Sequence, residues 1–125
     1  MNSKQNLAEK LCKEIHGEHA PDMIRELFVK ICPELGDYAV NFVFGEIYSN
    51  DVLTIEEREL IHIAGLVIES CHPQLKAHIL SAHRIGCSPK KIIATILQTL
   101  IIAGFPKVVN AMLIAKEVFE ENKML

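Results

Sequence analysis

Residues 58–86 read RELIHIAGLVIESCHPQLKAHILSAHRIG, and this stretch decides the fold that we expect. It has the pattern of two apolar helices joined by a short break at Ser70-Cys71-His72-Pro73. The hairpin could form an active site, or it could be a core element that carries a few polar side chains. It contains nearly all of the residues able to do chemistry here: Glu59, His62, Glu69, Cys71, His72, His78 and His83.

Length and composition limit the class of protein. The 125 residues are enough for one domain, which we assign to residues 1–125, and the 50% of apolar residues excludes a disordered chain. A net charge of −3 without a basic cluster argues against nucleic acid as a partner. The longest apolar run, residues 92–106, is too short and too interrupted to cross a membrane. Because MNSKQNLAEK lacks the apolar centre of a secretory signal, we expect a cytoplasmic protein.

The cysteine pattern and the missing motifs exclude several kinds of site. The sequence contains no C-x-x-C pair, so we expect reduced thiols and interpret three of them as ordinary small core residues. It also lacks G-x-G-x-x-G, a phosphate loop and G-x-S-x-G, which removes support for nucleotide binding and for serine hydrolysis. The four cysteines are Cys12, Cys32, Cys71 and Cys87.

Helical periodicity, capping residues and prolines predict six or seven helices, with no convincing strand pattern. Ser3 is the expected N-cap of the first helix, and Thr54 with Glu57 forms a capping box for the fourth. We therefore predict an all-α, compact orthogonal bundle. The expected helices cover about residues 3–16, 21–32, 33–49, 55–70, 73–86, 90–103 and 107–122.

The sixth expected helix, IIATILQTLIIAG at residues 92–104, is apolar almost all round. Such a helix needs burial on every face, and a chain of 125 residues has little interior to provide it. We therefore predict that this helix lies at a subunit interface and that the protein is a homo-oligomer.

Cys71 and His78 are candidates for chemistry, each with a simpler structural alternative. Cys71 lies near the start of the helix that Pro73 opens, where the helix dipole favours a thiolate. His78 has apolar neighbours, so it could be an acid–base group or a hydrogen-bonded core residue. The two residues are seven apart and would share a helix face.

Glu59 could act with His78, or it could be a solvated carboxylate in the first turn of its helix. Folding the hairpin about residue 71 or 72 places His78 opposite residue 65 instead. The offset of Glu59 is then about 9 Å at the α-helical rise. Direct contact would need a crossing angle, long side chains or a bridging water.

Two spacings are compatible with metal binding, Glu59-x-x-His62 and Glu69-x-x-His72. They lie ten residues apart along one helix and its end, so they point in different directions, and we predict no metal site. Gln98 and Asn110 are polar residues in the two most apolar segments. Each could satisfy a backbone group in the core or line a pocket and orient a substrate carboxylate.

Residues 42–120 resemble the carboxymuconolactone decarboxylase family in motif order and spacing. The resemblance implies an all-α fold, a homo-oligomer that is often a trimer or a hexamer, and no need for a metal or organic cofactor. The segments that carry it are Phe44-Gly45 through LTIEERELIHIAGL, then QLKAHILSAHRIGCS, then ILQTLIIAGFPKVVNAMLIAKEVF. Within them the shared features are R-E-L-I at 58–61, the L-x-x-H ending at His78, Gly86, Leu97-Gln98, A-G-F-P at 103–106 and Asn110-Ala111.

The same superfamily includes alkylhydroperoxidase D-like thiol peroxidases, whose pattern this sequence matches only in part. That branch has a glutamate, a cysteine twelve residues later, a second cysteine three later and a histidine four after that. The offsets fall on Glu59, Cys71, Gln74 and His78. Because Gln74 replaces the second cysteine, the two-cysteine disulfide cannot form. A one-cysteine cycle, in which an external thiol reduces a sulfenate at Cys71, is the alternative.

The decarboxylase branch lacks the cysteine pair and keeps His78, although it usually has an acidic residue near Gln74. It implies a lyase that removes CO₂ from a small lactone carboxylate and reprotonates the dienolate, with His78 as acid–base and Glu59 orienting it. We assign substrate binding to Gln98, Asn110 and His62. A peroxidase with peroxiredoxin activity at Cys71, and a helical oligomer without catalysis, are the other hypotheses.

Overall fold

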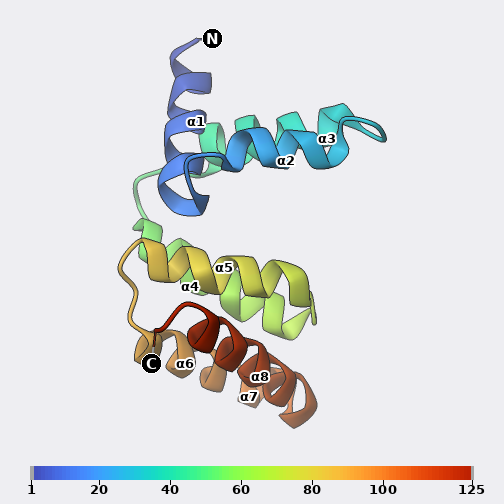
Figure 1. Cartoon of the computed structure of the whole chain (residues 1–125). Helices are drawn as coiled ribbons and strands as arrows, with labels where there is room; N and C mark the ends of the chain where they lie inside the picture. Colours follow the sequence, from blue (N-terminus) through green and yellow to red (C-terminus); the bar gives the residue numbers. More distant parts are fainter. Residues whose placement is uncertain (1, 125) are drawn as a thin grey trace. The chain divides into compact units, whose positions relative to one another are not determined.

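The computed structural model describes residues 2–124, and the regular elements among them are all helical, which confirms the expected all-α class (Figure 1). None of the helices in this range is long and apolar enough to cross a membrane. The elements are α1 (Ser3–His16), α2 (Ala20–Phe28), α3 (Pro33–Asp37), the π-helix η1 (Tyr38–Ile47), α4 (Ile55–Ile68), α5 (His72–Arg84), α6 (Pro89–Gln98), α7 (Leu100–Ala103) and α8 (Phe105–Glu121).

The helices group into two units, which we describe separately. Unit 1 comprises Met1–Thr54 and unit 2 comprises Ile55–Leu125. Unit 1 contains α1 to η1, and unit 2 contains α4 to α8 together with the hairpin at residues 58–86.

The N-cap of α1 is Asn2, and the prediction that Ser3 holds this position is wrong by one residue. The Asn2 side-chain oxygen accepts a hydrogen bond from the backbone N–H of Gln5 at 2.8 Å. The Gln5 side chain accepts in return from the backbone N–H of Asn2 at 2.9 Å. This reciprocal pair satisfies two N–H groups that the helix leaves unbonded, and Ser3 becomes the first helical residue.

The expected third helix, residues 33–49, divides into α3 and the wider π-helix η1. Two glycines allow close packing at this point. A Cβ on Gly36 would lie 2.9 Å from the backbone Cα of Arg25, and a Cβ on Gly45 would lie 3.3 Å from Ala8 Cβ. Periodicity at the sequence level did not distinguish five-residue from four-residue hydrogen bonding along this segment.

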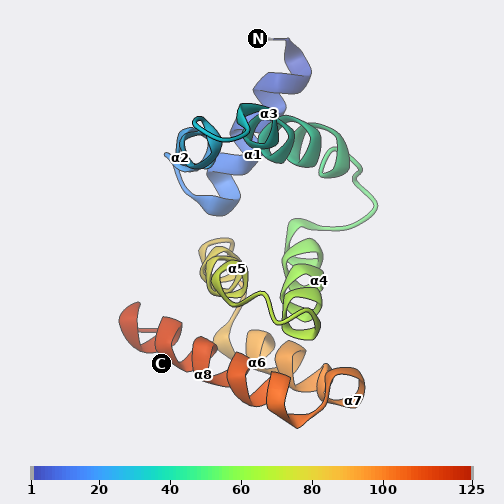
Figure 2. The same cartoon turned by 90° about the vertical axis from the view of Figure 1, so that its right-hand side faces the viewer.

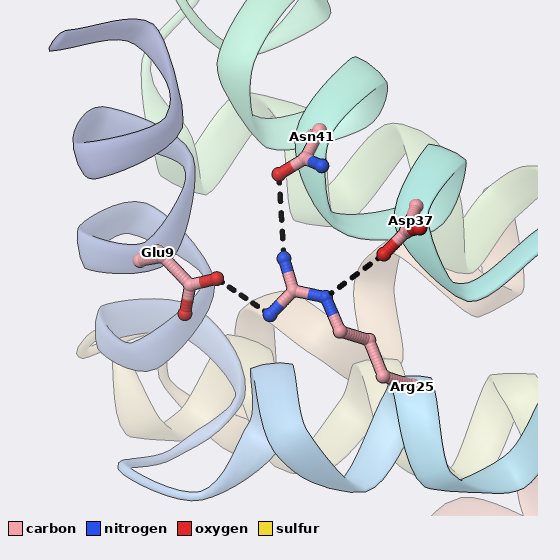
Figure 3. A network of polar contacts seen from close by, with 4 residues as sticks. All are labelled: Glu9, Arg25, Asp37 and Asn41. Atoms are coloured by element: carbon pink, nitrogen blue, oxygen red, sulfur yellow. Dashed lines mark hydrogen bonds and ion pairs between the residues drawn. The ribbon is translucent and has the colours of Figure 1, made fainter. Parts of the chain in front are cut away.

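Arg25 joins the four helices of unit 1 (Figure 3). Its guanidinium donates to Glu9 of α1 at 2.6 Å, to Asp37 of α3 at 3.2 Å and to Asn41 of η1 at 3.3 Å. In the same unit, Ala8, Cys12 and Ile15 of α1 are fully buried. The planar guanidinium suits such a junction because its donors point in several fixed directions.

In unit 2, α4 and α5 form the expected hairpin, and their axes are inclined to one another (Figure 1). Figure 2 shows α5 nearly end-on, whereas α4 is seen obliquely from its side. Ser70 in the connection has a positive φ of 56°, and the backbone N–H of Cys71 donates to the carbonyl of Leu66. The Lys107 ammonium donates to the carbonyl of Ile68 at 2.6 Å and so closes the end of α4.

The apolar core of unit 2 lies among α4, α5, α6 and α8 (Figures 1 and 2). It buries the inward faces of these helices at helical spacing. Its buried members are Ile63, Val67, Leu75, Ile79, Ala82, Cys87, Ile92, Ile96, Val108, Ala111, Ala115, Val118 and Phe119.

The expected sixth helix is two helices, α6 and α7, with a break at Thr99. The prediction of burial on every face does not hold within one chain. Ile92 and Ile96 are fully buried, whereas Ile101 and Ile102 of α7 are 82% and 76% exposed. The buried residues of α6 lie four apart on one face of the helix, and Leu97, Ile101 and Ile102 lie outside that face and are exposed in the single chain.

Candidate functional site

Glu59 and His78 form a direct contact within unit 2. The carboxylate of Glu59, in the first turns of α4, has no exposed surface, and its Oε2 lies 2.6 Å from Nδ1 of His78 on α5. The hairpin arithmetic, which placed His78 opposite residue 65, left direct contact dependent on a crossing angle, long side chains or a water, and the structure has the contact without a bridge. Because the axes of α4 and α5 are inclined to one another (Figure 2), these two side chains reach each other directly despite the axial offset.

The contact determines where the proton lies on His78. When Glu59 is ionised its oxygens only accept hydrogen bonds, and Nδ1 of His78 then carries the proton and donates it to Glu59. In the neutral ring the lone pair is then on Nε2. The His78 side chain is 20% exposed, which leaves part of the ring accessible to a small molecule.

His62 is the third member of this group. It lies one turn after Glu59 on α4, and its Nδ1 is 3.4 Å from Nδ1 of His78 and 4.0 Å from Oε1 of Glu59. The two imidazole rings meet edge to face, with centroids 4.8 Å apart and an interplanar angle of 89°. Burial and the neighbouring His78 lower the pKa of His62, in opposition to Glu59, so that this imidazole is neutral at pH 7.

Cys71 does not join this group. It is the N-cap residue of α5, and its thiol donates a weak hydrogen bond to the carbonyl of Glu69 at 3.7 Å. Seven residues separate it from His78, which is about 10 Å along the helix axis. Gln74, at the position of the second peroxidase cysteine, is exposed on α5.

Gln98 and Asn110 are both exposed, so the interpretation of either as a core residue is wrong. Gln98 lines an open groove of about 520 Å³ in unit 2, and Asn110 lies on the solvent side of α8. The groove follows a face of α4 that differs from the one carrying Glu59 and His62. Its lining is Leu60, Ala64 and Ile68 of α4, Lys91, Ala94, Thr95 and Gln98 of α6, Thr99, and Ile101 and Ile102 of α7.

The other cysteines divide between core and surface. Cys12 and Cys87 are buried as expected, and burial, aided by Glu9, raises the pKa of Cys12 to about 12. Burial likewise raises the pKa of Cys87. Cys32 is exposed beside Glu34, so the interpretation of this residue as a core thiol is wrong.

The fold and the site define a class of protein: a helical protein in which two crossed helices bring a buried carboxylate against histidine. Comparison with models of known protein families identifies the family of this chain. The model of the carboxymuconolactone decarboxylase family matches residues 33–117, and the chain belongs to this family.

A curated relative is similar over a shorter segment. Peroxisomal protein 2 of Saccharomyces cerevisiae (strain ATCC 204508 / S288c) is 35% identical over 61 residues, which is 48% of this chain. The chain spans 22% of the length of that protein.

Sequence reasoning did not recognise that His62 contacts the other two residues. The signal was the Glu-x-x-His spacing, which places Glu59 and His62 on one face of α4. Only the crossing of α5 shows that a second histidine meets that face.

Proposed function

We propose that this protein is a lyase of the carboxymuconolactone decarboxylase type that acts on a small lactone carboxylate by histidine acid–base chemistry. Two findings support it: membership of the family and the 2.6 Å contact between Glu59 and His78. The contact carries the proposal, because a carboxylate that holds one ring nitrogen of a histidine orients the other for proton transfer.

Each residue then has a chemical role. The bond between the carboxylate group and the lactone ring breaks and CO₂ leaves. The electron pair of that bond moves into the unsaturated lactone and forms a dienolate. The His78 imidazolium delivers a proton to carbon and recovers one from water. Glu59 fixes the ring through Nδ1 and stabilises the imidazolium, and no external cofactor takes part in turnover.

Replacement of His78 by glutamine tests the proposal. We expect loss of turnover by about 10²- to 10⁴-fold, the range that general acid–base groups contribute. The assay is the loss of 4-carboxymuconolactone absorbance together with release of CO₂. The matched control is His83→Gln, an exposed histidine in the last turn of the same helix. Full turnover in His78→Gln would reject the role of His78.

A thiol-dependent peroxidase that uses Cys71 is the second candidate. The supporting observation is that Cys71 is partly exposed at the N-terminus of α5. Hydrogen peroxide would oxidise its thiolate to sulfenate, with water as the other product, and an added thiol would reduce it. Intact mass after peroxide treatment tests this, with Cys71→Ser and Cys32→Ser as paired variants. An unmodified Cys71 in the folded protein would exclude the peroxidase.

We also propose that the protein is a homo-oligomer, with α7 and the start of α8 at the interface. The support is apolar exposure on adjoining positions: Ile101, Ile102 and Phe105 are 82%, 76% and 71% exposed. Size-exclusion chromatography with light scattering should give a multiple of 14.0 kDa. A mass of one chain at micromolar concentration would reject the interface.

A further inference from the structure

Glu59, His62 and His78 bring two imidazole nitrogens and a carboxylate together on the crossed helices of unit 2. We propose that these three side chains bind a divalent transition-metal ion of the zinc type.

The spacing of the two nitrogens supports a single shared ion. Zinc binds histidine nitrogen at about 2.0–2.1 Å, and a tetrahedral angle then separates two bound nitrogens by about 3.3 Å. Nδ1 of His62 and Nδ1 of His78 are 3.4 Å apart. The rings reach this separation edge to face, with 89° between their planes.

The Glu59 carboxylate lies close to both imidazole rings. Oε2 of Glu59 is 2.6 Å from Nδ1 of His78, and the other oxygen, Oε1, is 4.0 Å from Nδ1 of His62. Zinc ligation by the oxygen that now contacts His78 requires this separation to open from 2.6 Å to about 3.3 Å. Glu59 and His62 are one helical turn apart, so a single face of α4 supplies two of the three ligands.

The donor set indicates the kind of ion. Imidazole nitrogen suits zinc, cobalt, nickel and copper, whereas magnesium and calcium prefer oxygen ligands in larger number. Three protein ligands leave one tetrahedral position for water or another small ligand. The second Glu-x-x-His pair of the chain, Glu69 and His72, does not contribute to this site. Both residues are exposed and lie beyond the end of α4.

Metal at Nδ1 of His78 displaces the proton that this atom donates to Glu59, because a metal ligand must offer a lone pair. The single remaining proton of the neutral ring is then on Nε2. His78 can then no longer act alternately as acid and base, so the bound ion inhibits turnover. The inhibition rests on the proposed function, whereas the binding of the ion does not.

The test is titration of the full chain, without a polyhistidine tag and after chelator treatment, with zinc chloride and cobalt(II) chloride. Isothermal titration calorimetry should give one zinc per chain, and cobalt should produce the visible absorption of a four-coordinate site. His62→Gln should weaken zinc binding by about tenfold or more. His83→Gln is the matched control and should bind as the original protein does.

Equal binding by His62→Gln and His83→Gln, or no saturable binding at all, would overturn the proposal. Because a variant could lose its fold, circular dichroism accompanies each titration. Histidine NMR signals of the unmodified protein provide a second readout: zinc must shift those of His62 and His78 and leave that of His83. If the original protein binds zinc and His78→Gln keeps full turnover, only the proposed function is rejected. An inactive His78→Gln in a protein that binds no zinc would reject only the metal site.

Discussion

Replacement of Glu59 by glutamine tests how much the buried carboxylate contributes to the state of His78. The substitution keeps the shape of the side chain and removes its charge. The hydrogen bond that it alters is short, 2.6 Å, and its acceptor has no exposed surface. Hydrogen bonds to charged groups contribute about 1.5–3 kcal/mol, because the ionised partner strengthens them.

If that stabilisation is present in the transition state, its loss slows turnover by about 10- to 150-fold. The glutamine amide can also turn its N–H₂ toward His78, which would place the lone pair on Nδ1 and the proton on Nε2. We therefore expect a fall in kcat for 4-carboxymuconolactone, and nitrogen-15 NMR of His78 should show a change of tautomer.

The control is Glu69→Gln, which removes an exposed carboxylate just beyond the same helix. Circular dichroism must show that Glu59→Gln is folded. The reasoning would be refuted by a folded variant whose kcat is within twofold of the original and whose His78 keeps its tautomer.

Two further predictions concern thiol reactivity and packing. Iodoacetamide at pH 8 should modify exposed Cys32 and leave Cys12 unmodified, because a buried thiol with a pKa of about 12 is protonated at that pH. Peptide mapping of the folded protein measures the labelling of each cysteine. Equal labelling of Cys12 and Cys32 would contradict the burial of Cys12. Gly36→Ala should destabilise by about 1–3 kcal/mol, since its Cβ would lie 2.9 Å from the Arg25 backbone. Gly65 lies in α4, and a Cβ added to it would have no other atom within 4 Å, so Gly65→Ala should stabilise the protein by about 0.5–1 kcal/mol. Urea unfolding measures both variants, and a Gly36→Ala protein more stable than Gly65→Ala would refute the packing.

The local elements could be predicted because their causes are local. Pro73, Pro89 and Gly86 mark helix ends whatever surrounds them, and α1 spans the residues expected of it. The division of residues 33–49 into α3 and η1 was not predictable from periodicity. It accompanies the close approach of Gly36 and Gly45 to other helices, which is a property of packing.

For the candidate site, residue types and spacing identified Glu59, His62 and His78 as polar residues in an apolar hairpin. Sequence alone also determined the all-α class, the family and the absence of a second cysteine at Gln74. The tertiary structure decided which of these residues meet. Helix rise measures distance along one axis, whereas the crossing of α4 and α5 brings side chains from different heights together, so Glu59 touches His78 and Cys71 does not.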